Sequence, residues 1–590
     1  MVLLLRLPFL NQAVQGDEST FLASAAHAQI DPLHPNHTHY IFTDAREDVD
    51  LRGGSHMPMD AWVLAGLIAI FGEVKEVPFH AAYIVFSLLA AVAMYSLARR
   101  FSPQPLWAVL LFLAVPAFVV NGGSFEADVP HLAFFLCGMA CFITAVDRRN
   151  LKWLGASALF LACAALTVMQ AQMAAPILLA YVWLYARDWK PGWVAAFAPC
   201  IALAGWEIFE RLSSGVFPFL MTARYVNEQG WDKLAPKLLS AAGLLMHLWF
   251  IVFPWLLAAG LWAAWRRRDR DAAFLAWWIG IYLAAACALF FSGSARYLLP
   301  IVAPVAIWAS FARRSWVIGG FALQMALSLC LAVENYQHWA AYREFAREVV
   351  QQAAGHRMWI SSEWGLRHYM EDAGARVASP DQLIPPGDVV VWSELVAPVP
   401  LQHPGELAAT LLEKEVRPWM PLRLIGLESY AGFSSIQKGF SPFGIGMDLV
   451  DRIHADIYKE ARPTLKDLPM NAPEAEAQIV SGIFRLEEGK QRWTSGTATV
   501  MLVSPADAEP LHVNFYVPDN APARKVWVLL DGQTVYSETL PGPGMHRLVT
   551  PPQKARAATS VVALQVDRTF SAPGDSRQLG VVLLDMGWGK

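Results

Sequence analysis

The pattern of apolar and polar positions divides the chain into two halves. Up to about His338 the sequence consists mostly of long apolar runs separated by short polar connections. From there to Lys590 it has the mixed pattern of a water-soluble protein. A bilayer core of about 30 Å requires about 20 apolar residues in a spanning helix. The first half therefore predicts a polytopic α-helical membrane domain.

Ten apolar segments are predicted to be membrane helices. They are Val77–Leu97, Pro105–Val120, Val129–Val146, Leu151–Thr167, Gln172–Tyr185, Trp193–Phe209, Leu239–Trp265, Ala272–Phe291, Tyr297–Phe311 and Trp316–Val333. Several have fewer than about 20 residues, so we expect their ends to lie partly in the membrane interface.

Basic residues mark every second connection between these segments. The clusters are Arg99-Arg100, Arg148-Arg149 with Lys152, Arg187 with Lys190, Arg266–Arg268 with Arg270, and Arg313-Arg314. The positive-inside rule places all five connections in the cytoplasm. The polar segment of residues 11–60 and the C-terminal half are then expected to share the outer face.

The first residues of the chain form a short apolar segment. Met1–Leu10 would extend only about 15 Å as a helix, too little to cross a membrane. We expect it to be the outer end of a longer helix whose remainder precedes Met1.

The second half predicts two soluble parts. Ala340–Gln352 and Gly365–Ala373 have helical spacing, whereas Met358–Ser361 and Val389–Trp392 are short β-rich runs. Residues 339–470 are therefore expected to form a small α/β domain after a membrane domain of residues 1–338.

From about Ile479 the pattern becomes all-β. The strand-length runs are Thr497–Val503, Leu511–Val517, Lys525–Leu530, Thr534–Leu540, Val561–Val566 and Leu579–Leu584. Asp531-Gly532 lies between two of them and is a strong hairpin signal. This spacing predicts a β-sandwich over residues 471–590. Trp493 and Trp527 are candidates for stacking on sugars, with burial in the core as the alternative.

Composition supports a membrane protein. Of 590 residues, 55% are hydrophobic and 16% charged, far fewer charges than in soluble chains of this length. The net charge of −4 is too small to indicate a nucleic-acid partner. The six cysteines all lie in apolar runs, which excludes a disulfide framework and a CxxC metal site. His34, His37 and His39 fit no standard zinc spacing, so no metal ligand is predicted.

Charged residues in the first outer segment and at outer helix ends are candidates for chemistry. Adjacent carboxylates at the mouth of a membrane bundle, here Asp17-Glu18, are costly unless they line a wet, functional cavity. Asp128 begins a predicted membrane helix, where a carboxylate suits the helix dipole. Arg296 lies within reach of a lipid phosphate, which its planar fork matches. The simpler interpretations are a solvated or capping acid for Asp17 and an interfacial anchor for Arg296.

A set of short motifs occurs in a fixed order along the first half. They are Arg6-Leu7-Pro8, Asp17-Glu18, His56-Met57-Pro58, Glu126-Ala127-Asp128-Val129-Pro130, Ala165-Leu166-Thr167 and Ala295-Arg296-Tyr297-Leu298-Leu299-Pro300. Over about residues 1–335 this set resembles the GT-C integral-membrane glycosyltransferases. The nearest branch is that of the protein O-mannosyltransferases and lipid A aminoarabinose transferases.

The resemblance implies a function and a location. The donor would be a polyprenyl-monophosphate-linked sugar, transferred with inversion to a cell-envelope glycan, lipid or protein. Transfer would take place on the outer, periplasmic face of a bacterial inner membrane. The resemblance implies no definite cofactor, and a divalent metal is left open. Asp17 and Glu18 would be catalytic, and the donor phosphate would be bound by Arg296, Asp128, His56 and Tyr297.

Departures and alternatives accompany the resemblance. Relatives often carry a lysine after Leu166-Thr167, where this chain has Val168, so Arg296 is expected to bear more of the phosphate binding. A lipid-diphosphate oligosaccharide donor is an alternative. A membrane transporter is another, although its ionisable residues would cluster near the midplane rather than at outer helix ends. A catalytically inactive envelope scaffold with a glycan-binding β-sandwich is the third.

Overall fold

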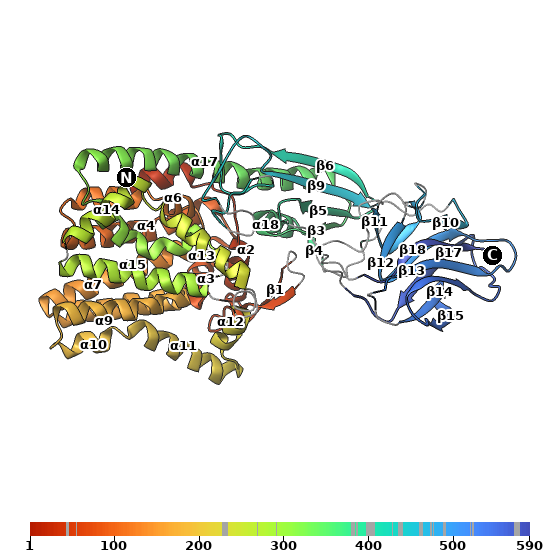
Figure 1. Cartoon of the computed structure of the whole chain (residues 1–590), viewed down its shortest axis with the longest axis horizontal. Helices are drawn as coiled ribbons and strands as arrows, with labels where there is room; N and C mark the ends of the chain where they lie inside the picture. The colour runs from red at the N-terminus through yellow and green to blue at the C-terminus, as the bar shows by residue number, and fades with distance from the viewer. Residues whose placement is uncertain are drawn as a thin grey trace.

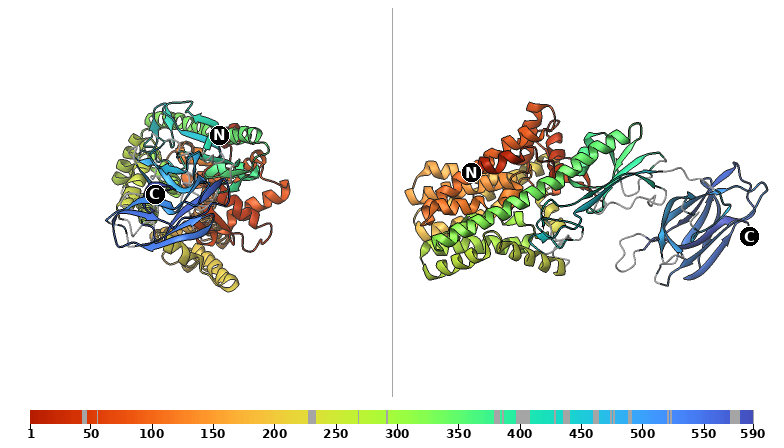
Figure 2. Two further views of the ribbon diagram at one scale, coloured as in Figure 1. Left: turned by 90° about the vertical axis from the view of Figure 1, so that its right-hand side faces the viewer. Right: turned by 90° about the horizontal axis from the view of Figure 1, so that it is seen from above.

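The chain forms three successive parts along one long axis. A helical bundle is followed by an α/β part and then by a strand-rich C-terminal part (Figure 1), and a second direction of view shows the same order (Figure 2). This computed structural model describes residues 1–42, 47–54, 56–226, 234–267, 269–290, 292–378, 384, 387–396, 408–427, 429–434, 441–458, 464–472, 475, 477–487, 491–519, 521, 524–570 and 579–589. Arg268, from one predicted cytoplasmic cluster, lies outside the described residues.

The bundle and the segments on it are mainly helical. The helices are α1 (Val2–Arg6), η1 (Leu7–Phe9), α2 (Glu18–His27), η2 (Leu51–Gly53), α3 (Pro58–Phe71), α4 (Glu76–Phe101), α5 (Pro105–Leu113), α6 (Pro116–Asn121), α7 (Asp128–Arg148), α8 (Leu151–Thr167), η3 (Met169–Met173), α9 (Ala174–Tyr185), α10 (Lys190–Ala195), α11 (Ala198–Ser214), α12 (Pro218–Val226), α13 (Leu234–Leu248), α14 (Pro254–Arg267), α15 (Arg270–Leu289), η5 (Ala295–Leu298), α16 (Leu299–Ala309) and α17 (Arg314–Gln352). A hairpin of β1 (His39–Phe42) and β2 (Glu47–Asp50) stands beside them.

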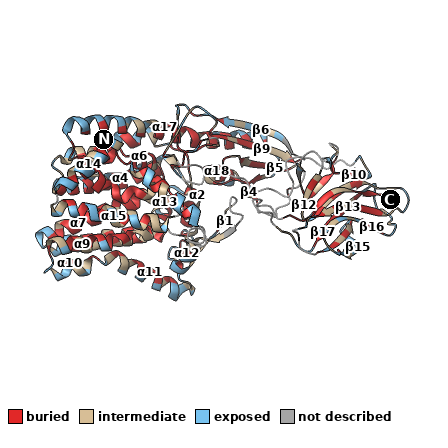
Figure 3. Ribbon diagram, in the orientation of Figure 1, coloured by how far each residue is buried: buried red, intermediate tan, exposed pale blue. Residues whose placement is uncertain are grey.

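Four of the described helices are long and apolar enough to cross a membrane, namely α4, α7, α15 and α17. The first of them has apolar residues on its exposed face as well as on its buried face. In α4, Ala90 and Met94 are buried, while Leu88 and Val92 on the opposite side are exposed. Figure 3 shows exposed residues along the outside of the bundle. A helix that is apolar all round is typical of a lipid-facing span.

Three of the predicted spans are interrupted, which corrects the sequence interpretation. Pro105–Val120 is divided into α5 and α6, Trp193–Phe209 into α10 and α11, and Leu239–Trp265 into α13 and α14. Proline lacks an N–H and cannot continue a helix, and Pro116 and Pro254 each begin the second piece of their segment. The ten-crossing topology stays a prediction.

The 39-residue helix α17 extends from the bundle into the α/β part (Figure 2). There it packs, with α18 (Trp364–Asp372), beside a sheet in the order β4-β3-β5-β9-β6. The strands are β3 (Met358–Ile360), β4 (Arg376–Val377), β5 (Val389–Ser393), β6 (Ala408–Val416) and β9 (Asp451–Tyr458), with a small pair of β7 (Leu422–Arg423) and β8 (Gly444–Ile445). The helices and strands predicted for this part lie within a few residues of these elements.

The C-terminal part is strand-rich, as predicted, but it is one continuous sheet rather than a sandwich of two. Its nine strands are β10 (Asp467–Pro469), β11 (Ile479–Glu487), β12 (Gln491–Val503), β13 (Leu511–Val517), β14 (Lys525–Leu530), β15 (Gln533–Thr539), β16 (Gly544–Val549), β17 (Thr559–Val566) and β18 (Val582–Trp588). Strand β12 pairs with β18 at Arg492 and Trp493 and with β17 from Thr497 onward, so it belongs to both halves. This shared strand joins the two halves into a half-barrel.

The predicted hairpin at Asp531-Gly532 is confirmed. Both residues have positive φ, 48° and 79°, and they connect β14 to β15, in which Leu530 pairs with Gln533. Two successive positive φ values define the type I′ turn, whose twist matches that of the flanking strands.

The α/β part is docked on the first outer segment by close backbone contact. Gly365, in the first turn of α18, lies against the Val14 carbonyl, and a Cβ added at 365 would be 1.9 Å from that oxygen. The Val14 N–H donates to the Tyr369 hydroxyl at 2.7 Å. The Tyr40 hydroxyl donates to Glu363 at 2.9 Å. These contacts place residues 13–40 between the bundle and the α/β part.

Substituting Gly365 by alanine is expected to separate α18 from the first segment. The neighbour is backbone, which cannot rotate away, so we expect a loss of roughly 1–3 kcal/mol or more in the free energy of unfolding. Thermal unfolding in detergent measures it. Gly66→Ala in α3 is the matched control, because no heavy atom lies within 4 Å of its added Cβ. Equal unfolding midpoints for both variants would contradict the expected clash.

Candidate functional site

An ion-pair cluster around Arg296 joins three distant segments of the chain. One Nη of Arg296 donates to Oδ2 of Asp17 at 3.0 Å. The other pairs with Glu126 and lies 3.7 Å from Oδ2 of Asp128. The structure thus brings together Asp17, Asp128 and Arg296, which were singled out from the sequence, and adds Glu126.

Asp17 is the N-cap of α2, but its carboxylate makes no capping hydrogen bond. It points to Arg296 instead, and 47% of its side chain is exposed. The interpretation of Asp17 as a capping acid is therefore wrong. An exposed carboxylate held at one oxygen by a guanidinium is available to accept a hydrogen bond from a further molecule.

Glu18 is fully buried and joins two loops. Its two carboxylate oxygens accept from the backbone N–H groups of Gln15 at 2.9 Å and Phe125 at 2.7 Å. Burial, reinforced by the Glu126 carboxylate, raises the pKa of Glu18 to about 8. This geometry favours a positioning role, in which Glu18 holds the loop before α2 against the loop before α7.

Glu126 is the residue that the sequence interpretation missed as part of the site. It was quoted only as a neighbour of Asp128 in a motif, and that motif was the available signal. Burial raises the pKa of Glu126 to about 7, while the Arg296 guanidinium acts in the opposite direction. Gly16, at φ +47°, allows the close approach, since a Cβ there would be 2.7 Å from the Glu126 carboxylate.

Arg296 is carried by the short turn η5, which the α/β part holds in place. The Ala295 N–H and the Ser294 hydroxyl both donate to the Phe433 carbonyl, at 3.0 and 3.3 Å. Tyr297 accepts a hydrogen bond from Ser292 at 2.9 Å, and its ring centre is 5.7 Å from the guanidinium carbon. The Nε of Arg296 is buried and has no hydrogen-bond partner within the described part of the chain.

His56 lies on the segment between the β1–β2 hairpin and α3. It forms an isolated β-bridge with Val168, and its ring packs on Phe21 with centroids 4.5 Å apart. Burial lowers the pKa of His56 to about 4, while Asp128 and Asp17 act in the opposite direction and Arg296 acts with burial. The imidazole is therefore neutral at neutral pH. Its Nδ1 is buried without a partner among the described residues.

The position of Arg296 among the carboxylates is relevant to metal binding at this site. The Arg296 guanidinium occupies the position between the three carboxylates that a bound cation would take. His34 and His37 of the first outer segment have separate partners, Asp31 at 2.9 Å and Glu210 at 2.7 Å. A side chain of the chain itself thus supplies one positive charge among these carboxylates.

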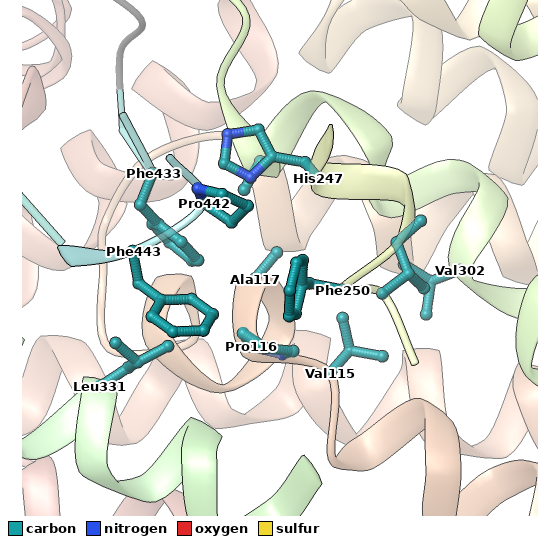
Figure 4. Close-up of a pocket in the computed structure, with 12 residues that line it drawn as sticks. Val115, Pro116, Ala117, His247, Phe250, Val302, Leu331, Phe433, Pro442 and Phe443 are labelled. Atoms are coloured by element: carbon teal, nitrogen blue, oxygen red, sulfur yellow. The ribbon is translucent and has the colours of Figure 1, made fainter. Parts of the chain in front are cut away.

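An apolar pocket adjoins the turn that carries Arg296 (Figure 4). Ala295 forms part of its wall. The other lining residues are Val115, Pro116, Ala117, His247, Phe250, Ile251, Val302, Leu331, Phe433, Pro442 and Phe443. The wall is mostly aliphatic and aromatic, which suits a hydrocarbon group rather than a sugar.

Residues 55–209 match the family model described as dolichyl-phosphate-mannose-protein mannosyltransferase. The resemblance to the GT-C membrane glycosyltransferases is confirmed. The match covers the segment from the residue before His56 into α11, including the Glu126–Asp128 motif, but not Asp17 or Arg296.

Several solved structures resemble this chain at low sequence identity. ArnT from Cupriavidus metallidurans in the apo state has 15% sequence identity and a TM-score of 0.45, covering 66% of this chain and 91% of that one. The same protein bound to undecaprenyl phosphate has 14% identity and a TM-score of 0.44, covering 67% and 92%. The arabinosyltransferase EmbB from Mycobacterium smegmatis has 14% identity and a TM-score of 0.31, covering 91% and 59%. A comparison with curated proteins gives no match.

Replacing His56 by glutamine is expected to make the fold less sensitive to acid. The folded pKa of His56 is about 4 and its ordinary value 6.5, so the unfolded chain binds a proton on this residue first. Stability present above pH 6.5 is therefore lost as the pH falls toward 4. Unfolding midpoints in detergent between pH 7.5 and 4.5 measure the loss.

His27→Gln, at a half-buried histidine of α2, is the matched control for this pH series. It should lose stability on acidification as the wild type does, whereas His56→Gln should lose less. An identical fall in all three proteins would show that His56 does not contribute to the acid sensitivity.

Proposed function

We propose that this chain transfers a sugar from a polyprenyl-monophosphate donor to a cell-envelope acceptor on the outer, periplasmic face of a bacterial membrane. The observation that carries the proposal is the contact of Arg296 with the exposed carboxylate of Asp17. One pair of residues thereby offers an acceptor for a hydroxyl proton and a cation for a phosphate at one place. A transporter or an inactive scaffold would not need these two groups at one place, so both alternatives are less favoured.

In the proposed reaction Asp17 is the base. Its carboxylate takes the proton of the acceptor hydroxyl as the hydroxyl oxygen bonds to the anomeric carbon. The bond between that carbon and the phosphate oxygen breaks, and the lipid phosphate leaves with the electron pair. Attack opposite the leaving group inverts the configuration of the sugar. The Arg296 contact fixes the direction of the Asp17 carboxylate.

Arg296 stabilises the departing phosphate in this scheme. Its two Nη atoms face carboxylates, whereas its Nε is a buried donor without a partner among the described residues. A buried donor of this kind costs free energy until an acceptor arrives. A phosphate oxygen at Nε would satisfy it, while Asp128, His56 and Tyr297 surround the group.

The protonation of the buried acids makes an anion tolerable here. Burial raises the pKa of Glu18 to about 8 and that of Glu126 to about 7. Near neutral pH these groups therefore carry less negative charge than free carboxylates would. The repulsion between these acids and a bound phosphate is therefore weaker than that from free carboxylates. Asp17 and Asp128 remain as partners of Arg296.

The apolar pocket supplies a place for the lipid part of the donor. It opens beside Ala295, one residue from Arg296, and is walled by Phe250, Phe433 and Phe443 (Figure 4). A polyprenyl chain is a branched hydrocarbon that such a wall accommodates. Its first units would lie against this wall with the phosphate at Arg296 and the sugar toward Asp17.

Asp17→Asn is expected to lower transfer by roughly 10²–10⁴-fold with the fold intact, because asparagine cannot accept the hydroxyl proton. The assay incubates the detergent-solubilised protein with envelope extract and a panel of undecaprenyl-phosphate sugars. Release of undecaprenyl phosphate is followed by mass spectrometry. Asp31→Asn, in the same outer segment, is the control and should retain wild-type turnover. Normal turnover by Asp17→Asn would refute the base.

Arg296→Ala is expected to reduce turnover at limiting donor by roughly tenfold or more, since charge-assisted hydrogen bonds contribute about 1.5–3 kcal/mol. Arg296→Lys keeps the charge but lacks the fork and Nε, so a partial defect is expected. The same assay is run against donor concentration, with Arg417→Ala at an exposed site as control. Wild-type donor dependence in Arg296→Ala would place the phosphate elsewhere.

A further inference from the structure

Three side chains of the C-terminal sheet meet on one face far from the bundle. Asp467 of β10 and His512 of β13 are each paired with Gly587, on the strand β18 between them. Asp585 lies two residues before Gly587. Because paired residues and residues two apart point to the same face of a sheet, all three side chains converge above Gly587.

Gly587 provides the room in which they meet. A Cβ added at this position would lie 2.4 Å from Oδ1 of Asp467. Because Gly587 has no side chain, the Asp467 and His512 side chains extend over this position of β18 toward each other. The possible ligand atoms of Asp467, His512 and Asp585 all lie within 4.8 Å of one another.

The orientation of the His512 ring is fixed by a backbone carbonyl. Nδ1 lies 3.0 Å from the Gly589 carbonyl oxygen, which can only accept, so Nδ1 carries the hydrogen. Nε2 then faces the two carboxylates. Asn514 donates to Oδ1 of Asp585 at 2.6 Å and orients that group in turn. Metal-binding histidines and carboxylates are held by outer contacts of this kind.

The two separations from His512 match those between ligands of one metal ion. Nε2 of His512 is 3.2 Å from Oδ1 of Asp467 and 3.3 Å from Oδ1 of Asp585. Ligands about 2.0–2.1 Å from a tetrahedral zinc ion stand about 3.3 Å apart. Direct charge-assisted hydrogen bonds are shorter, about 2.7–2.9 Å. One imidazole nitrogen and two carboxylates also suit zinc better than calcium or magnesium, which favour oxygen alone.

We propose that Asp467, His512 and Asp585 bind one divalent transition-metal ion of the zinc type. The ion joins β10, β18 and β13, three neighbouring strands of the sheet. Because β10 is the first strand of the C-terminal part, the ion fastens the point at which the chain enters this sheet. The site is structural and independent of the transfer chemistry at Arg296.

The test uses the full-length protein in detergent, stripped with a chelator and then dialysed against zinc chloride. Bound zinc is counted by elemental analysis after desalting. We expect one ion per chain and a rise of at least about 5 °C in the unfolding midpoint at roughly a hundredfold excess over the dissociation constant. A parallel series with calcium chloride should give neither.

Four variants separate the site from other binding. Asp467→Asn changes an exposed ligand with little effect on folding, and Gly587→Ala keeps all ligands but fills the gap between them. Both, and His512→Ala, should lose the zinc and the shift. His546→Ala, a histidine of β16 in the same sheet, should keep both. No bound zinc in the wild type, retention of zinc by Asp467→Asn, or equal binding of calcium would overturn the proposal.

Discussion

The pairing of Arg296 with three carboxylates is the interaction on which the candidate site depends. Glu126 is buried, and the more exposed Asp17 and Asp128 lie beside it, so three acidic groups are gathered at one place. Such a group is stable only when a counter-charge is fixed among its members. Arg296 supplies that charge and thereby holds together the loop before α2, the start of α7 and η5, which are far apart in the sequence.

The α/β part contributes to this arrangement although it carries none of the paired charges. The Phe433 carbonyl holds the turn that presents Arg296, and the Tyr369 hydroxyl holds Val14 a few residues before Asp17. Both partners of the central ion pair are therefore positioned from the same neighbouring part. A change at Gly365 should affect transfer without touching a substrate, as expected when outer contacts fix the geometry of a site.

The sequence predicted the structure correctly where the pattern of neighbouring residues determines it. The strands β13 and β14 and the Asp531-Gly532 hairpin follow from alternation and turn chemistry, and Arg296 with Asp17 and Asp128 follow from charge at outer helix ends. The sequence did not predict features that depend on how strands far apart in the chain pair with one another. The sharing of β12 between two halves of the sheet and the meeting of Asp467 with His512 depend on register, which no single segment encodes.

Two of the three interruptions that the hydropathy pattern concealed lie at one place, beside the turn η5. The break between α5 and α6 contains Val115, the break between α13 and α14 contains Phe250 and Ile251, and η5 begins with Ala295. All four residues line the apolar pocket. Inside a bilayer, non-helical backbone is tolerated only where protein or a cavity surrounds it. Pro116 and Pro254 thus divide two predicted spans into shorter helices. The ends of these helices form the wall against which a hydrocarbon chain can lie beside Arg296.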